Sequence, residues 1–349
     1  IILKAELSDD PEDEPTREYV KKKYNELKSK KKTAPVKQIS FWDFVNQFIQ
    51  DAEGTKRAAT IKTYKSARTY LQGYEKKRNI KLDWNSFDLD FPADFKKYFH
   101  IDKDCADNTY NGAIKNVKVW LNEAYAKKIN VYDHYKSKKY AVSNTPSDNI
   151  YLTAKEIDDL VALDLSHDKK LDRVRDLFVL ACCCGLRYSD FSILREENFA
   201  GNRLRIKTSK TGAEVVIPLH PHIVAIKAKY KNEANGLPRS MSNQKFNEYL
   251  KQLGKMAGIT RNVNVHTYKG PKVTEETKQA WELISTHTAR RSFATNLFKT
   301  KFPAISIMKI TGHTTEKAFM RYIKVGLEEN ADLLEMHWEK FYQNQKQVA

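Results

Sequence analysis

The chain has 349 residues, 41% of them hydrophobic, so it exceeds the usual single-domain size of about 100–200 residues and can build packed cores. Lys and Arg number 61 against 44 Asp and Glu, which gives a net charge of +17. This excess predicts a polyanionic partner, most often nucleic acid, rather than only a well-solvated surface. No apolar run approaches the ~20 residues of a membrane span. The start, IILKAELSDDPEDEP, turns acidic at once, unlike a signal peptide. These features predict a cytoplasmic protein of two domains with no membrane contact.

The four cysteines are Cys105 and the consecutive Cys182, Cys183 and Cys184. Adjacent residues on a helix point in different directions, and the chain has no C-x-x-C pair that would bind zinc. We interpret all four as reduced, buried thiols and expect neither a metal nor another cofactor.

The N-terminal part reads as a leader followed by a small helical domain. Residues 1–37 form an acidic patch and a lysine-rich stretch, which is either a linker or the end of an upstream domain. Ser40 is a candidate cap before FWDFVNQFIQDA, whose apolar residues recur at helical spacing. A further helix over about 107–128 has core spacing. We predict an all-helical domain over 38–134.

A basic helical pattern covers residues 55–79 within this domain. Its tyrosines, Tyr64, Tyr70 and Tyr74, either belong to the core or touch sugar and phosphate. A basic helix alone is weak evidence of nucleic-acid binding. The candidate DNA-binding residues are Lys56, Arg57, Lys62, Lys65 and Arg68.

A polar segment without periodicity, 135–149, predicts an interdomain linker. Thr153 then opens a capping box with Glu156, and an apolar helix over 172–184 ends at Gly185. Residues 203–219 alternate, turn near Thr211–Gly212 and alternate again, as in a β-hairpin. Helices are expected over about 220–232 and 241–256, a strand pair around 262–274, and helices from there on. The second domain, 150–326, is thus predicted to be mainly helical with a small antiparallel sheet.

Two stretches place basic residues at turns of this second domain. In CGLRYSDFSIL, Arg187 follows a glycine helix stop, and Ser189 or Asp190 is expected to cap the next helix. Asp190 is alternatively placed to orient the arginine. In TSKTG, Lys210 lies at the hairpin tip. Taken alone, each stretch fits an ordinary surface arginine or lysine. The functional interpretation is that the guanidinium of Arg187 binds an oxyanion with its rigid set of donors and that the flexible ammonium of Lys210 reaches into a groove.

Two more stretches contain histidine. In STHTARRSFATNLF, His287 and Arg290 are three residues apart and share a face at a helix start, where an anion is favoured. In ITGHTTEKAFMRYIKV, a short helix ends at Thr311 and Gly312, His313 lies in the turn, and Tyr322 is expected on a following helix. A lone tyrosine in such a setting is more often a core residue than a catalyst.

The order and local contexts of these residues resemble the tyrosine recombinase (phage integrase) family. The matching text is GLRYSD, a hairpin-tip KTG, HTARRSFAT and TGHTTEKAFMRYIKV. All six motif positions match, and Asp190 stands where these enzymes usually have an acidic residue. The likeness spans most of 150–325. The helical domain before it fits the family's SAM-like core-binding domain only by size and composition. The six residues are Arg187, Lys210, His287, Arg290, His313 and Tyr322.

The chemistry of these side chains fits metal-free phosphoryl transfer. A phenol with an unperturbed pKa near 10 needs help to lose its proton. Preorganised arginines and histidines stabilise charge on the phosphate, and a lysine can protonate the leaving oxygen. The resemblance implies that Tyr322 attacks a DNA phosphate to form a 3′-phosphotyrosyl link, with Lys210 as the general acid and Arg187 and Arg290 holding the phosphate. It also implies that His313 contacts the phosphate and that His287 is a proton acceptor or a phosphate ligand.

The resemblance further implies a homotetramer that exchanges strands of double-stranded DNA through a Holliday junction, with possible DNA-bending accessory proteins. A C-terminal helix over 327–349 has apolar residues at 3–4 spacing and is predicted to dock on a neighbouring protomer, although packing on its own domain fits as well. The leader and the missing initiator methionine favour a mobile-element integrase whose arm-binding domain was removed. The alternatives are a chromosome-dimer resolvase, a type IB topoisomerase and, least favoured, a non-catalytic DNA-binding regulator.

Overall fold

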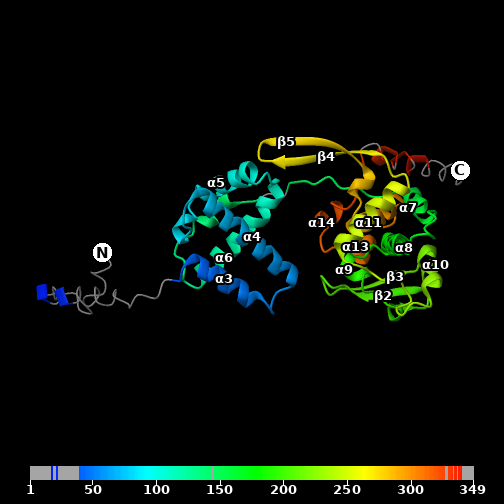
Figure 1. The fold of residues 1–349 in the computed structure, drawn as a ribbon, viewed down its shortest axis with the longest axis horizontal. Coiled ribbons are helices and arrows are strands. Elements are labelled where there is room, and N and C mark those ends of the chain that lie inside the picture. Colours follow the sequence, from blue (N-terminus) through cyan, green and yellow to red (C-terminus); the bar gives the residue numbers. More distant parts are fainter. Residues whose placement is uncertain are drawn as a thin grey trace, which may run out of the picture. The chain divides into compact units, whose positions relative to one another are not determined.

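The computed structural model describes residues 17–18, 21–22, 39–142, 145–326, 329–332, 334–335 and 337–339 (Figure 1). The chain divides into two compact units, one of Ile1–Thr145 with Tyr268–Val273 and the other of Pro146–Thr267 with Thr274–Ala349. Most of the predicted leader lies outside the described residues. Within those ranges, no helix has the length and apolar character needed to cross a membrane. The predicted fold class, mainly helical with small antiparallel sheets, is confirmed.

The first unit is a helical domain around an aromatic core. Its helices are α3 (Phe41–Ala52), α4 (Ala58–Arg78), α5 (Phe91–Lys97) and α6 (Asp107–Ala126), with the short turns η1 (Trp84–Ser86) and η2 (Tyr98–Asp102) between α4 and α6. Ser40 caps α3 as expected, because its side chain accepts from the amide of Asp43. Tyr64 and Tyr74 are buried among the aromatic residues, so the core interpretation is the correct one for these two.

The packed part of this unit extends into the segment predicted as a linker. Two short helical turns, η3 (His134–Lys136) and η4 (Lys138–Tyr140), place Tyr135 and Tyr140 in the core. The hydroxyl of Tyr140 donates to the carbonyl of Asp88 at 2.9 Å. Burial of two large aromatic side chains therefore outweighs the polar composition around them.

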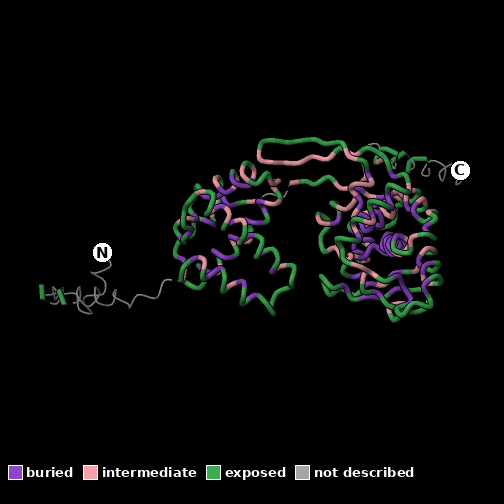
Figure 2. Tube along the Cα trace, in the orientation of Figure 1, coloured by how far each residue is buried: buried purple, intermediate pink, exposed green. Residues whose placement is uncertain are grey.

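The second unit is built around α8 (Lys169–Cys184), which lies in the middle of the unit and is buried for most of its length (Figure 2). It packs against α7 (Ala154–Val161), α10 (Pro221–Tyr230), α11 (Asn243–Met256) and α12 (Thr286–Lys299). The short helices α9 (Tyr188–Phe191), α13 (Ala304–Thr311) and α14 (Glu316–Met320) and the turns η5 (Glu196–Asn198) and η6 (Ala280–Leu283) complete it. α8 can be surrounded in this way because its second half, residues 177–184, is apolar on every side, while the buried charged side chains of its first half are paired.

A three-stranded antiparallel sheet lies at the edge of this unit, in the order β1 (Phe199–Ala200), β2 (Arg203–Lys207), β3 (Glu214–Pro218). β2 and β3 pair in the predicted hairpin, with Leu204 opposite Ile217 and Ile206 opposite Val215, all four buried. A second hairpin, β4 (Asn262–Lys269) and β5 (Lys272–Gln279), is longer than the predicted strand pair. β5 is almost wholly exposed, whereas β4 is mostly half-buried (Figure 2).

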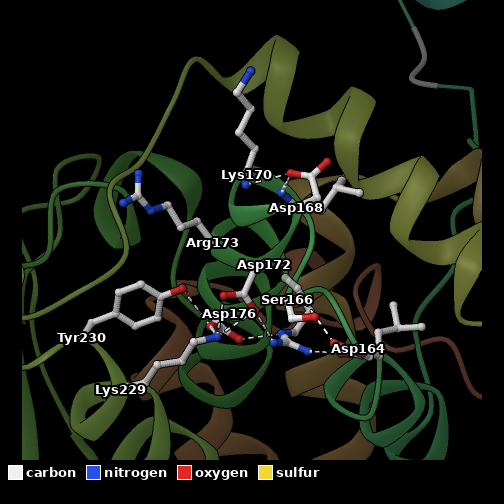
Figure 3. Close-up of polar contacts among 12 residues, drawn as sticks. Asp164, Ser166, Asp168, Lys170, Asp172, Arg173, Asp176, Lys229 and Tyr230 are labelled. Carbon is white, nitrogen blue, oxygen red and sulfur yellow. Dashed lines mark hydrogen bonds and ion pairs between the residues drawn. The ribbon is translucent and has the colours of Figure 1, made fainter.

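An ionic network of the second unit joins α7, α8 and α10 (Figure 3). Arg175 is buried between Asp172 and Asp176 and donates to three carbonyls at the end of α7. Lys229 and Tyr230 of α10 bind Asp176 from the other side. Each of these charges has opposite charges beside it, as buried ions require. This network holds α7, α8 and α10 together.

The cysteines differ in exposure. Cys182 and Cys184 are buried as predicted, whereas Cys105 and Cys183 are partly exposed. All four thiols are free. Burial raises the pKa of Cys183 and Cys184 to about 12, so both remain protonated at neutral pH.

Candidate active site

Two arginines meet where α8 and α13 end. Gly185 ends α8 with φ +65°, and a side chain there would come within 2.3 Å of the Phe293 ring, so glycine is required. Arg187 follows as the N-cap of α9. Arg290 extends from α12 and is 1% exposed. It donates from Nη1 to the carbonyl of Gly185 at 2.9 Å and from Nη2 to the carbonyl of Thr311.

The two guanidiniums have too few acceptors. Burial, reinforced by the neighbouring charge of Arg187, lowers the pKa of Arg290 to about 10. Eight buried side-chain polar atoms in the described ranges have no hydrogen-bond partner, and four belong to this region: Arg187 Nη1, Arg290 Nε, Asp190 Oδ2 and His313 Nε2. Buried donors without an acceptor are costly unless a ligand completes them. Two such cations suit an oxyanion between them.

The loop that carries Lys210 is fixed to α9 by Asp190. Gly212, with φ +69°, closes this β2–β3 turn by donating to the carbonyl of Thr208 at 2.9 Å. The carboxylate of Asp190 is fully buried and accepts from the amide of Ser209 at 2.8 Å. The predicted cap is therefore wrong, because Arg187 is the N-cap and Ser189 and Asp190 lie inside α9. The carboxylate of Asp190 thus accepts a hydrogen bond from a main-chain amide of the hairpin loop, and not from an amide at the start of α9.

His287 lies in the first turn of α12, which begins with a capping box formed by other residues. Desolvation lowers the pKa of His287, and four cations lower it further: Arg291, Arg290, Arg187 and Lys210. The imidazole is therefore neutral at pH 7 and able to accept a proton. The charges of Arg187, the N-cap of α9, and of Lys210, in the β2–β3 loop, therefore both act on this ring.

His313 and Tyr322 face each other across the end of α13. Gly312 ends that helix with φ +64°, and the rings of His313 and Tyr322 lie 4.6 Å apart, centroid to centroid. The guanidinium carbon of Arg290 lies 5.5 Å from the centre of the Tyr322 ring. Burial, and then the charges of Arg290 and Arg187, lower the pKa of His313 to about 4. Its ring is therefore neutral at physiological pH.

Tyr322 does not lie on a helix, contrary to the prediction. α14 ends at Met320, and the amide of Tyr322 donates to the carbonyl of Phe319 at 2.7 Å in the turn that follows. The hydroxyl of Thr295 on α12 donates to the carbonyl of Tyr322 at 3.2 Å. The carbonyl of Tyr322 therefore accepts a hydrogen bond from a side chain of α12, where in a continuing helix it would accept from a main-chain amide of the next turn.

The segment after Tyr322 is held by Glu329. Its carboxylate accepts from the hydroxyl of Tyr151 and from the ammonium of Lys299, both at 2.7 Å, and from the amide of Gly326 at 3.0 Å. The described residues beyond it are helical, with Leu334 48% and Trp338 54% exposed. The remainder of the predicted C-terminal helix, including Phe341 and Tyr342, lies outside the described residues.

The hairpin loop and the His313 turn lie next to each other. A side chain at Gly312 would come within 3.7 Å of the Thr211 hydroxyl, one residue after Lys210. The structure thus gathers the six predicted residues into one region of the second unit, although they are up to 135 residues apart in sequence. In the part of the chain that is described, no three His, Cys, Asp or Glu residues form a metal site.

The five candidate DNA-binding residues of the first unit separate into two groups. Lys65 pairs with Glu53 at 2.6 Å, and Arg68 donates to Asn46 at 2.9 Å, so both are engaged with α3. Lys56, Arg57 and Lys62 are exposed. Lys62 lines a groove of about 500 Å³ between α4 and α6, beside Lys115 and Asn116 and several small or hydroxyl side chains. Of the five, Lys62 is the residue that lines this groove.

Sequence reasoning missed two contacts of this region: the amide of Ser209 that binds Asp190, and Thr311. Thr311 is 1% exposed and contacts both Arg290 and His313. The only signal in the sequence was a hydroxyl residue directly before Gly312–His313, which is not distinctive by itself.

Two family models match the chain. One, described as the phage integrase SAM-like domain, covers residues 40–142, and the other, described as the phage integrase family, covers residues 151–329. A comparison with curated protein sequences found no match.

Solved structures with the same fold include three DNA complexes. A lambda integrase (75–356) dimer bound to a COC′ core site has a TM-score of 0.61 at 16% identity, covering 82% of this chain and 95% of that chain. The Tn1549 transposon integrase in complex with a circular intermediate DNA has a TM-score of 0.58 at 14% identity, covering 85% of this chain and 99% of that chain. The XerH recombinase bound to its difH substrate has a TM-score of 0.56 at 16% identity, covering 94% of this chain and 90% of that chain. At such identities the likeness is one of fold.

Proposed function

This chain belongs to the phage integrase family of tyrosine recombinases, enzymes that cleave and rejoin DNA, and we propose that it integrates and excises a mobile genetic element. The observation that carries the chemistry is the pair of desolvated guanidiniums, Arg187 and Arg290, beside Tyr322 and His313. Arg290 Nε and Arg187 Nη1 are buried donors without an acceptor, and two such donors match the non-bridging oxygens of one backbone phosphate. The fold likeness to two integrases supports the mobile-element role.

In the proposed reaction, the phenol oxygen of Tyr322 forms a bond to the scissile phosphorus while the bond from phosphorus to the 5′ oxygen breaks. The phenolic proton passes to a neutral histidine, His287, whose low pKa leaves it free to accept. Lys210 protonates the departing 5′ oxygen. Arg187 and Arg290 stabilise the charge on the non-bridging oxygens, and His313 contacts the same phosphate. The 3′-phosphotyrosyl bond conserves the energy, so a 5′ hydroxyl can reverse the step without ATP or metal.

We propose that double-stranded DNA contacts the first unit through the groove between α4 and α6 that Lys62 lines. A net charge of +17 supports a large electrostatic contribution to that binding. Four copies of the chain on two duplexes would exchange strands through a Holliday junction. One of the fold relatives was solved as a lambda integrase tetramer on such a junction, which supports this assembly.

The test uses a nicked suicide substrate and the Tyr322→Phe variant. The wild-type protein is expected to form a covalent protein–DNA adduct, while Tyr322→Phe binds the same DNA and forms none. An adduct that persists in Tyr322→Phe would overturn the assignment of the nucleophile.

A second assay separates the alternative functions. Recombination between two defined sites on one plasmid, with no general loss of supercoils, is expected of an integrase or a resolvase. Relaxation of any plasmid would identify a topoisomerase, and binding without adduct formation would identify a regulator. Recombination only between two identical sites, without intermolecular integration, would favour a chromosome-dimer resolvase.

A further inference from the structure

A single buried side chain, the hydroxyl of Thr311, connects the end of α13 to the imidazole of His313. Its Oγ1 lies 2.6 Å from the carbonyl oxygen of Ile307 and 2.7 Å from Nδ1 of His313. Thr311 itself is 1% exposed, so water does not compete for these contacts. Both distances are those of well-formed hydrogen bonds.

The contact with Ile307 determines the direction of these bonds. A carbonyl oxygen only accepts, so an oxygen–oxygen separation of 2.6 Å requires the threonine proton between the two atoms. The hydroxyl has one proton, and its lone pairs therefore face Nδ1. A hydrogen bond at 2.7 Å then requires that Nδ1 carry the imidazole proton. The reverse assignment would bring two lone pairs together at Ile307.

A neutral imidazole has one N–H group, so Nε2 is left with a bare lone pair. This atom is buried and has no partner. The charged groups that act on the ring are Arg290 and Arg187, and its other neighbours are the rings of Phe319, at 5.6 Å, and Tyr322. A phosphate oxygen attracted by these two arginines would repel the lone pair of Nε2 at close range unless a proton came between them.

We propose that Thr311 is a positioning residue that holds His313 as the Nδ1–H tautomer, so that Nε2 is the atom that takes up a proton when the phosphate binds. The proton comes from solvent. Once Nε2 carries it, the imidazolium donates to a non-bridging oxygen. Because the negative phosphate offsets the two guanidiniums that disfavour the imidazolium, DNA binding and proton uptake at His313 are coupled. The coupling to DNA binding rests on the proposed function. The Nδ1–H tautomer does not, because it is a property of the DNA-free protein.

The substitution that tests it is Thr311→Val, with Thr311→Ser as the matched control. Valine keeps the branched shape of threonine and replaces the hydroxyl by a methyl group, which forms no hydrogen bond. The contact between Arg290 and the Thr311 carbonyl involves the main chain and is retained in both variants. Serine keeps the oxygen that accepts from Nδ1. Thermal unfolding of the three proteins checks that each is folded.

The first readout is the tautomer of His313 in the DNA-free, full-length protein, measured by nitrogen-15 NMR of labelled histidine near pH 7. The wild type and Thr311→Ser are expected to show Nδ1–H, and Thr311→Val to lose that preference. A wild-type ring protonated on Nε2, or a tautomer unchanged in Thr311→Val, would overturn the inference. Neither outcome depends on catalysis, so the proposed function would still be judged by the Tyr322→Phe adduct assay.

The second readout is the rate of adduct formation on the suicide substrate as a function of pH. Thr311→Val is expected to slow the reaction by about tenfold to a hundredfold, as for a displaced acid–base group, and to change its pH profile. Thr311→Ser should restore both. In a His313→Ala background, Thr311→Val should have no added effect. An equal additional loss in that background would mean that Thr311 acts only through packing.

Discussion

The buried carboxylate of Asp190 couples two residues of the proposed active site. Asp190 belongs to α9, the helix that begins directly after Arg187. Its carboxylate accepts from the amide of Ser209, the residue before Lys210. A displacement of this carboxylate would therefore move the lysine loop relative to the arginine. Geometric errors of about 1 Å are enough to slow an oriented reaction by about a hundredfold.

We accordingly expect Asp190→Ala to reduce adduct formation by about tenfold to a hundredfold, a loss of ~1.4–3 kcal/mol of transition-state stabilisation. The defect should be largely rescued by a substrate with a 5′-bridging phosphorothiolate, whose leaving group needs no proton. Lys210→Ala is the control and should be rescued as well. Failure to rescue Lys210→Ala would remove it as the general acid. If only Lys210→Ala were rescued, the defect of Asp190→Ala would not arise from a displaced Lys210.

The lowered pKa of His313 makes the stability of the second unit depend on pH. The folded ring has a pKa of about 4, whereas an unfolded histidine has a pKa near 6.5. Between these values the unfolded chain binds the additional proton, so the free energy of unfolding should fall as pH decreases from about 6.5 to about 4. For this one proton the slope is at most about 1.4 kcal/mol per pH unit.

Denaturant titrations of the wild type and His313→Gln across this pH range measure that contribution. The glutamine variant should lose less stability on acidification than the wild type. Equal pH slopes for the two proteins would mean that His313 is not the group that titrates. The residual slope in the variant is expected from His287 and His220, whose pKa values are also lowered.

At the scale of elements, α4 offers a direct comparison between two lysines. Lys62 lines the groove between α4 and α6, while Lys65 is engaged with Glu53. We expect Lys62→Ala to weaken DNA binding about equally for all sequences and to reduce the salt dependence by about one phosphate contact. Lys65→Ala should change both less, because its ammonium already has a counter-charge. Affinities measured at several salt concentrations decide this, and a larger effect of Lys65→Ala would place the DNA on the α3 side of α4.

The elements themselves could be predicted where the pattern of apolar residues was strong. α8 and its stop at Gly185, the capping box of α7 and the β2–β3 hairpin all follow from periodicity and turn residues. The turn at Tyr322 could not be predicted in this way, because its carbonyl is bound by the hydroxyl of Thr295 on α12, 27 residues away. The contact of Asp190 with Ser209 likewise depends on how the hairpin docks on α9, which no local pattern encodes.

The gathering of the six motif residues was predictable from their order and contexts, but not from local physical chemistry. Arg187 alone fits a surface arginine, yet its Nη1 is buried beside a second buried cation. Burial of like charges arises only when α9, α12 and α13 meet. The role of Thr311 was missed for the same reason, since a threonine at a helix end is common.

At the scale of the whole molecule, the exposed apolar residues near the C-terminus favour an intermolecular contact. Leu334 and Trp338 are both about half exposed. We expect deletion of residues 333–349, which leaves Glu329 in place, to keep binding to a single site and to impair the pairing of two sites. Gel-shift assays with one and two sites separate these steps. Normal pairing by the truncated protein would contradict docking of the tail on a neighbouring copy.

The anchoring of Glu329 to Tyr151 and Lys299 limits how far Tyr322 can travel. Position 329 lies seven residue steps after position 322, and a fully extended chain of that length spans roughly 24 Å. While that anchor holds, Tyr322 stays within about this distance of Glu329, and the centre of its ring lies 5.5 Å from the guanidinium carbon of Arg290 in the same chain. Each subunit is thus expected to cut the strand that its own guanidiniums hold, so that a mixture of Tyr322→Phe and Arg290→Ala subunits would not regain cleavage by sharing parts.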